Sequence, residues 1–210
     1  QSPLRRKWSM FILVATCVLI VNAGCSVPPY NIDSLKSSAN PENQIFDELL
    51  IGSWEAFIKD EPYIFITVTR EAGDSKNYTI KMHSVEDREG AAEWSGSMRL
   101  LRIGDCEFVE LESTSLEDPP PEEERMTVDG EPLRTAYSLW RVTHSKDTIQ
   151  VWGFGDKQIL ESLPKSEVVP AVPQGKNMTI ANCSTDELQI FLLENGGKMT
   201  KKAEDFRRFE

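Results

Sequence analysis

Short runs rich in β-branched and aromatic residues, separated by turn residues, fill the chain from Leu50 to Phe154. Runs of this length and spacing are typical of an antiparallel β-sandwich or barrel. In one of them Tyr78, Ile80 and Met82 alternate with polar residues, which is the pattern of a strand with one buried face. The sequence therefore predicts a mainly β domain.

We expect seven strands in this region: Leu50–Phe57, Pro62–Arg70, Asn77–Val85, Trp94–Ile103, Cys106–Ser113, Leu133–His144 and Thr148–Phe154. Gly104-Asp105 joins two of them, and glycine suits the first position of a type II′ hairpin because it accepts positive φ. Phe108 breaks the alternation of its strand, since it shares a face with Glu110 and Glu112. Residues 178–181 add a further candidate strand.

A helix is predicted over residues 184–195, because Ser184 and Glu187 have the spacing of a capping box. Leu188, Phe191 and Leu192 form an apolar stripe that we expect to dock on the sheet. A shorter helix is predicted within 156–163. Residues 198–210 are predicted to be a charged tail, pinned by Phe206 and Phe209.

Residues 114–132 are predicted to be an acidic, proline-rich loop, because proline removes hydrogen-bond donors and like charges repel. The acids of this loop lack the Asp-x-Asp-x-Asp-Gly spacing that wraps oxygen atoms around calcium. His83 and His144 also lack the spacing of metal ligands. We therefore predict no metal site and no cofactor.

The N-terminal segment has the layout of a secretory signal. Arg5, Arg6 and Lys7 precede an apolar stretch, Trp8–Val21, that is shorter than the roughly 20 residues needed to cross a bilayer as a helix. We predict that residues 1–24 are a signal peptide and that residues 25–44 are a flexible tether. A single β domain, residues 45–210, would then follow.

The end of this segment, Val21-Asn22-Ala23-Gly24-Cys25, resembles the lipobox of bacterial lipoproteins. The resemblance implies that Cys25 carries lipid such as palmitate and anchors the chain to a membrane, for which two or more acyl chains suffice. By the same analogy, Ser26 implies delivery to the outer membrane of the cell envelope. The alternative is an ordinary cleaved signal that happens to precede a cysteine.

Two short motifs resemble those of the lipocalins. Gly52-Ser53-Trp54 is similar to the family's Gly-x-Trp motif, and Thr135-Ala136-Tyr137 is similar to Thr-Asp-Tyr, with Ala136 in place of the acid. The chain from about residue 45 to 209 thus looks like the lipocalin-like domains of bacterial lipoproteins. The resemblance implies an antiparallel meander β-barrel, or a strongly curved sheet, with a C-terminal α-helix, and assigns Trp54 to packing at the base.

Charge and cysteine content limit the partners. The net charge is −11, and it becomes −14 once the three basic residues of the signal are removed. Such an acidic chain does not suit nucleic acid or an anionic lipid surface. Cys106 and Cys183 are candidates for a disulfide in an oxidising compartment, which the sequence leaves open.

If the barrel is hollow, its inner wall is expected to include Ile64, Ile66, Tyr78, Ile80, Leu101, Val109 and Trp140. Four tryptophans, Trp54, Trp94, Trp140 and Trp152, either fill the core or line a pocket. His144 lies at a strand end and is interpreted as a solvated turn residue. The alternative is that it acts as a catalytic base.

We find no nucleophile motif and no glycine-rich phosphate loop, so we expect no enzymatic activity. The leading hypothesis is a membrane-anchored lipoprotein that binds an apolar or amphipathic small molecule, such as lipid, in its barrel. The alternative is an envelope scaffold that meets a protein partner through the loop 114–132 or a sheet edge. A hydrolase would require a polar cleft in which His83 or His144 lies beside a carboxylate. The sequence identifies no ligand-binding residues.

Overall fold

A computed structural model of the protein describes residues 32–58, 60–73, 75–84, 92–114, 127–128, 131–132, 135–164, 166–171 and 176–209. Its helices are η1 (Glu48–Leu50), α2 (Lys157–Glu161), α3 (Thr185–Asn195) and η3 (Gly196–Lys198). Its strands are β1 (Ile32–Ser34), β2 (Gln44–Ile45), β3 (Gly52–Ile58), β4 (Glu61–Arg70), β5 (Tyr78–Ser84), β6 (Ala92–Ile103), β7 (Cys106–Thr114), β8 (Thr127–Val128), β9 (Glu131–Pro132), β10 (Thr135–His144), β11 (Thr148–Gly153), β12 (Ser166–Ala171), β13 (Lys176–Ala181) and β14 (Lys201–Phe209).

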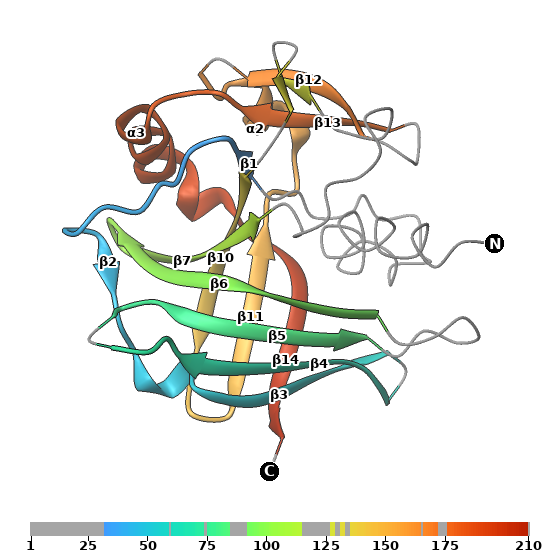
Figure 1. Ribbon diagram of the computed structural model, residues 1–210. Coiled ribbons are helices and arrows are strands. Elements are labelled where there is room, and N and C mark those ends of the chain that lie inside the picture. Colours follow the sequence, from blue (N-terminus) through green and yellow to red (C-terminus); the bar gives the residue numbers. More distant parts are fainter. Residues whose placement is uncertain are drawn as a thin grey trace.

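Eight strands form a closed antiparallel barrel in the order β3-β4-β5-β6-β7-β10-β11-β14 (Figure 1). β11 pairs with β10 along one edge and with β14 along the other, and β14 pairs with β3. These pairings close the barrel. Gly104 has φ = +59° at the β6–β7 turn, as expected for a hairpin that begins with glycine. The predicted mainly β meander barrel with a C-terminal α-helix is confirmed.

The C-terminal segment is a barrel strand rather than the charged tail that the sequence predicted. β14 pairs with β11 along residues 201–207 and with β3 at residues 206–209. Phe206 points inward and is buried, whereas Arg207 lies on the opposite face and is exposed. With so few apolar residues among charged ones, the alternation of this strand is too weak to recognise in the sequence.

A second layer covers one side of the barrel. β1, β13 and β12 continue the sheet beyond β10, and α2 and α3 lie in the same layer (Figure 1). The outer faces of β6, β7 and β10 contribute the buried residues Leu101, Phe108 and Leu139 to an apolar cluster with Leu188, Phe191 and Leu192 of α3. The predicted docking of this helix on the sheet is confirmed, and so is the capping box at Ser184.

This layer explains why Phe108 interrupts the alternation of its strand. Phe108 points outward into the α3 layer, where a Cβ at Gly196 would lie 2.5 Å from its ring. The interpretation of Leu101 as an inner-wall residue is wrong, because Leu101 belongs to the outer cluster. A strand that is buried on both faces has apolar residues on both. The alternation of apolar and polar residues therefore cannot show which residues face the barrel interior.

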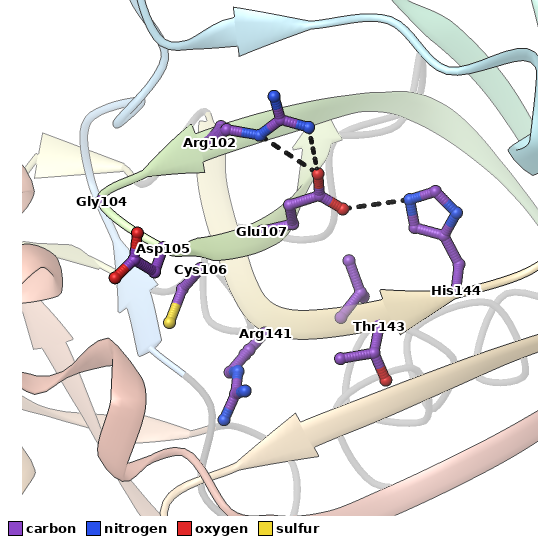
Figure 2. A pocket seen from close by; sticks show the side chains of 9 residues that line it. Arg102, Gly104, Asp105, Cys106, Glu107, Arg141, Thr143 and His144 are labelled. Carbon is purple, nitrogen blue, oxygen red and sulfur yellow. Dashed lines mark hydrogen bonds and ion pairs between the residues drawn. The ribbon is translucent and has the colours of Figure 1, made fainter.

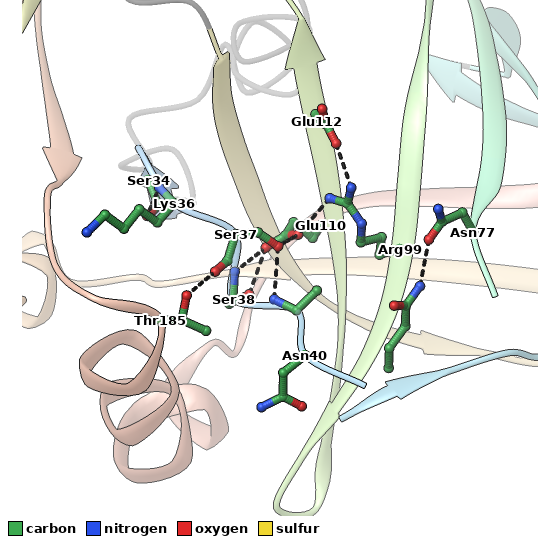
Figure 3. A network of polar contacts seen from close by, with 12 residues as sticks. Ser34, Lys36, Ser37, Ser38, Asn40, Asn77, Arg99, Glu110, Glu112 and Thr185 are labelled. Carbon is green, nitrogen blue, oxygen red and sulfur yellow. Dashed lines mark hydrogen bonds and ion pairs between the residues drawn. The ribbon is translucent and has the colours of Figure 1, made fainter. Parts of the chain in front are cut away.

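The described part of the predicted tether, residues 32–44, lies against the barrel. β1 pairs with β10 and β13, and Ser37 and Ser38 bind the fully buried carboxylate of Glu110 (Figure 3). The Ser38 amide donates to Glu110 Oε1 at 2.6 Å, and Arg99 forms a salt bridge to Oε2 at 3.2 Å. This segment is therefore part of the domain, which corrects the prediction of a flexible tether for these residues. Residues 25–31 lie outside the described range.

Candidate functional site

At one end of the barrel, which we call the base, lie η1 and the β6–β7 and β10–β11 turns, and Leu50 of η1 packs into the inner core. Trp54 is fully buried there, and its indole N–H donates to the Leu50 carbonyl at 3.0 Å. The Arg208 guanidinium stacks on the indole at 4.2 Å and donates to the carbonyl oxygens of Ile51 and Leu49. Trp54 thus packs at the base, as the motif resemblance implied.

Gly52 is required by the same arrangement. Its φ is +146°, and a Cβ at this position would lie 2.3 Å from Arg208 Nη1. Only glycine combines this backbone conformation with such a close approach. Gly52 and Trp54 are therefore structural residues of the closed end.

A shallow pocket of about 460 Å³ opens at the rim of the base, beside the β6–β7 turn (Figure 2). Its lining is mixed polar and charged: Arg102, Gly104, Asp105, Cys106, Glu107, Arg141, Val142, Thr143 and His144. Glu107 lies at the centre, since it accepts hydrogen bonds from Arg102 at 2.6 Å and contacts His144 Nε2 at 3.1 Å. The opposite charges of Arg102 and Glu107 compensate each other.

His144 was interpreted as a solvated turn residue, but its side chain is only 7% exposed. The pocket does bring the imidazole beside a carboxylate in a polar lining, as the hydrolase hypothesis required. No hydroxyl or thiol in the described part of the chain hydrogen-bonds to the ring. Thr143 Oγ1 instead contacts Trp152 and Gln150. The pocket therefore lacks a nucleophile–base pair among these residues.

The opposite end of the barrel, where β5 ends and β6 begins, we call the far end. Strand register places Met82 and Trp94 opposite each other and in line with Ile66, and Leu111 opposite Met98. Met82, Trp94, Leu111 and Tyr63 pack against the inner core but are only partly buried. A Cβ at Gly96 would lie 2.5 Å from Trp94 Cζ2, so the indole lies along the barrel wall over this glycine. The inner wall is therefore apolar and partly accessible at the far end.

Two polar features interrupt this apolar wall. The Tyr63 hydroxyl donates to the carboxylate of Glu204, a residue that faces inward opposite Val151. Burial raises the pKa of Glu204, and the hydrogen bond from Tyr63 opposes that shift only in part. Ser84 is 2% exposed, faces inward opposite Ile64, and its Oγ has no hydrogen-bond partner among the described residues.

Sequence reasoning missed these polar residues. Glu204 lies in the segment that was predicted to be a tail, so its side could not be assigned. Ser84 ends a strand that was correctly predicted, but a serine at a strand end carries no signal of burial. The contact between Tyr63 and Glu204 joins residues 141 positions apart.

Several predicted features remain outside the described structure or are not formed in it. Cys25, the predicted lipidation site, and most of the loop 114–132 lie outside the described residues; β8 and β9 form a small hairpin within that loop. Cys106 and Cys183 are not joined by a disulfide. Within the described ranges, no group of three His, Cys, Asp or Glu side chains is placed to hold a metal ion. No described helix is long and apolar enough to cross a bilayer.

Comparison with known proteins adds no relative: no protein-family model matches the chain, and no curated protein or solved structure shows significant similarity to it.

Proposed function

We propose that this protein is a non-enzymatic lipoprotein of the bacterial cell envelope, with a lipocalin-like barrel that binds an apolar or amphipathic small molecule. The bound molecule would enter the barrel at the far end, between Tyr63, Met82, Trp94 and Leu111. Cys25 would carry the lipid that holds the domain at the membrane, with the outer membrane as its destination.

The single observation that supports ligand binding most is the contrast along the inner wall. At the base, large side chains such as Trp54 and Tyr78 are fully buried in the inner core. At the far end, Met82, Trp94 and Leu111 face the same interior but keep part of their surface accessible. Apolar surface that folding leaves accessible in a concave wall is stabilised when an apolar ligand covers it.

The anchor is supported by the sequence of the first 25 residues: a basic start, an apolar run of signal-peptide length and small residues before Cys25. Metabolic labelling with a palmitate analogue tests it. We expect label on the wild-type chain and none on Cys25→Ala, with Cys106→Ala as the matched control that keeps its label. Equal labelling of Cys25→Ala would contradict the anchor.

A second candidate is the envelope scaffold, and one observation favours it. Ile190 and Leu193 lie one turn apart on α3 and are 57% and 63% exposed. Apolar residues grouped on an exposed helix face suit contact with a protein partner. Loss of a crosslinked complex in cells for the double variant Ile190→Ser/Leu193→Ser would support the scaffold function. An unchanged set of crosslinked proteins would contradict it.

Native mass spectrometry and titration with the neutral fluorophore N-phenyl-1-naphthylamine test the ligand. We expect a co-purified small molecule or saturable probe binding. Trp94→Ala should weaken probe binding at least tenfold, because it removes a large, partly accessible apolar side chain from the far end. Trp152→Phe is the matched control, since Trp152 lies on the outer face and bonds Thr143. A wild-type protein that neither carries nor binds an apolar molecule would overturn the proposal.

A further inference from the structure

At the far end, an apolar wall lies beside polar side chains whose hydrogen-bonding capacity is not filled within the described chain. Ser84 Oγ is buried and makes no hydrogen bond within the described chain. A buried hydroxyl without a partner costs free energy, so native proteins usually supply a partner, a water molecule or a ligand. Tyr63, next to Ile64 in β4, brings its hydroxyl to Glu204 on the same inner wall.

Glu204 keeps hydrogen-bonding capacity for a further partner. Besides Tyr63, it accepts only from the Asp205 amide, at 3.1 Å, among the described contacts. No lysine or arginine of the described residues forms a salt bridge with it; Lys202 acts on it only through its charge and pairs with Asp205. A carboxylate offers about four lone-pair sites, so at least one acceptor position remains.

The nearby charges on the same face of the sheet reinforce this pattern. Asp33 of β1 accepts a hydrogen bond from Ser138, which shares its face with Leu111. The inward-facing arginines Arg70, Arg102 and Arg208 lie at the base, where they contact Phe46, Glu107 and Trp54. The described arginines of the inner wall therefore lie at the base, where Glu107 also lies, and not beside Glu204.

We infer that the ligand of the far end is an amphiphile whose headgroup donates hydrogen bonds and carries no negative charge, a hydroxyl or ammonium group, and that Glu204 with Tyr63 and Ser84 receives it. This inference rests on the proposed function, and it excludes free fatty acids as the preferred ligand. The chain of the amphiphile would lie against Trp94, Met82 and Leu111. Its headgroup would donate to Glu204 and satisfy Ser84 Oγ.

The exclusion follows from electrostatics. A fatty-acid carboxylate beside Glu204 would bring two negative charges together in a wall with few charges to compensate them, where water screens poorly. A hydroxyl or ammonium group meets the same carboxylate with a charge-assisted hydrogen bond, which is stronger than one between neutral groups. Headgroup charge, rather than chain length, should therefore decide affinity.

Displacement of the naphthylamine probe at pH 8 by three ligands with the same acyl or alkyl length tests the inference: 1-lauroylglycerol, dodecylamine and laurate, each below its critical micelle concentration. For the wild type we expect laurate to compete at least tenfold more weakly than either of the others. Glu204→Gln should bring laurate to within threefold of lauroylglycerol. Asp205→Asn is the matched control, because it removes a neighbouring charge that faces outward toward Gln150 and Lys202.

The outcomes separate the inference from the proposed function. If the probe does not bind at all, the proposed function fails. If the probe binds but laurate competes as well as lauroylglycerol, or if Glu204→Gln leaves the ratio unchanged, only the inference about the headgroup fails. A control Asp205→Asn that changes the ratio as much as Glu204→Gln would also overturn it, since the effect would then come from net charge. Tyr63→Phe, which keeps the ring and removes the donor to Glu204, should preserve the discrimination against laurate.

Discussion

The two ends of the barrel are built from the same strands but differ in how completely their side chains are buried and hydrogen-bonded. At the base, Trp54 is fully buried, its N–H is bonded and Arg208 covers its ring. At the far end, Trp94 is partly accessible, Ser84 Oγ has no partner within the described chain and Glu204 is desolvated. Groups that folding does not favour are expected where a protein binds something, because function there opposes stability. The ends differ in the accessibility of their tryptophans and in the desolvated Glu204, whereas each contains one buried polar atom without a partner among the described residues, Ser84 Oγ at the far end and His144 Nδ1 at the base.

The largest effect is expected for Trp54→Ala. Removal of a fully buried indole leaves a cavity and takes away the ring on which the Arg208 guanidinium stacks, at a cost of about 4 kcal/mol in the free energy of unfolding. The matched substitution at the far end, Trp94→Ala, should cost about 1 kcal/mol, because that side chain is only partly buried. Urea denaturation of both variants measures the contrast, and equal losses would show that the two ends are packed alike.

Glu110→Ala should cost about 3 kcal/mol, since it leaves the buried Ser38 amide and hydroxyl without their acceptor and removes one of the two carboxylate partners of Arg99. This carboxylate is as buried as any residue in the domain, yet it has a complete set of partners. The neighbouring Glu112→Ala is the control, and its side chain is 19% exposed, so a loss below about 1 kcal/mol is expected. A small loss for Glu110→Ala would mean that the segment from Ile32 to Asn40 contributes little to the fold.

Gly52→Ala tests the close approach at the base. It should cost about 2 kcal/mol, because the new methyl group would collide with Arg208 and the backbone would be strained. Gly73→Ala provides the comparison, since Gly73 also has positive φ (+91°) but has no atom within 4 Å of its Cβ position. If thermal denaturation gives the two variants the same loss, the contact with Arg208 is not responsible.

At high pH, Glu204→Gln should raise the free energy of unfolding, whereas the substitutions of Trp54 and Gly52 lower it. Burial raises the pKa of Glu204, so folding favours its protonated form. The stability that this group contributes is therefore present below the ordinary glutamate pKa and is lost as the pH rises through the raised value. Gln keeps the acceptor for Tyr63 without the charge. Urea denaturation should find the variant more stable than wild type at pH 8, with the difference shrinking toward pH 4.5; a variant less stable at pH 8 would contradict the desolvation of this carboxylate.

Ser84→Ala should change stability least, between zero and about 1 kcal/mol in favour of the variant, because the removed hydroxyl has no partner to lose in the described structure. Ser38→Ala is the control: Ser38 is equally buried, but its hydroxyl donates to Glu110 at 2.8 Å, so about 1 kcal/mol should be lost. A comparable loss at both positions would show that Ser84 is satisfied in solution.

Local signals predicted most barrel strands and the helix. The alternation of Tyr78, Ile80 and Met82, the glycine at 104 and the capping box at Ser184 each act over a few residues, so the sequence contains all the information they need. The predictions were wrong where a residue has a distant partner. Leu101 and the segment from residue 32 to 44 were misassigned because the layer formed by α3 and β1 covers the outer face of β6 and β7.

The sequence by itself determined the fold class, the closed end at Gly52-Ser53-Trp54 and the C-terminal helix, because periodicity and short motifs are properties of neighbouring residues. Only the tertiary structure decided that the last strand completes the barrel, that Glu110 is buried and satisfied, and that Tyr63, Ser84 and Glu204 lie on one inner wall. Such groupings join residues that are far apart along the chain. The burial and electrostatic surroundings of these residues depend on the distant residues that the closed barrel places beside them. No local sequence pattern specifies those neighbours.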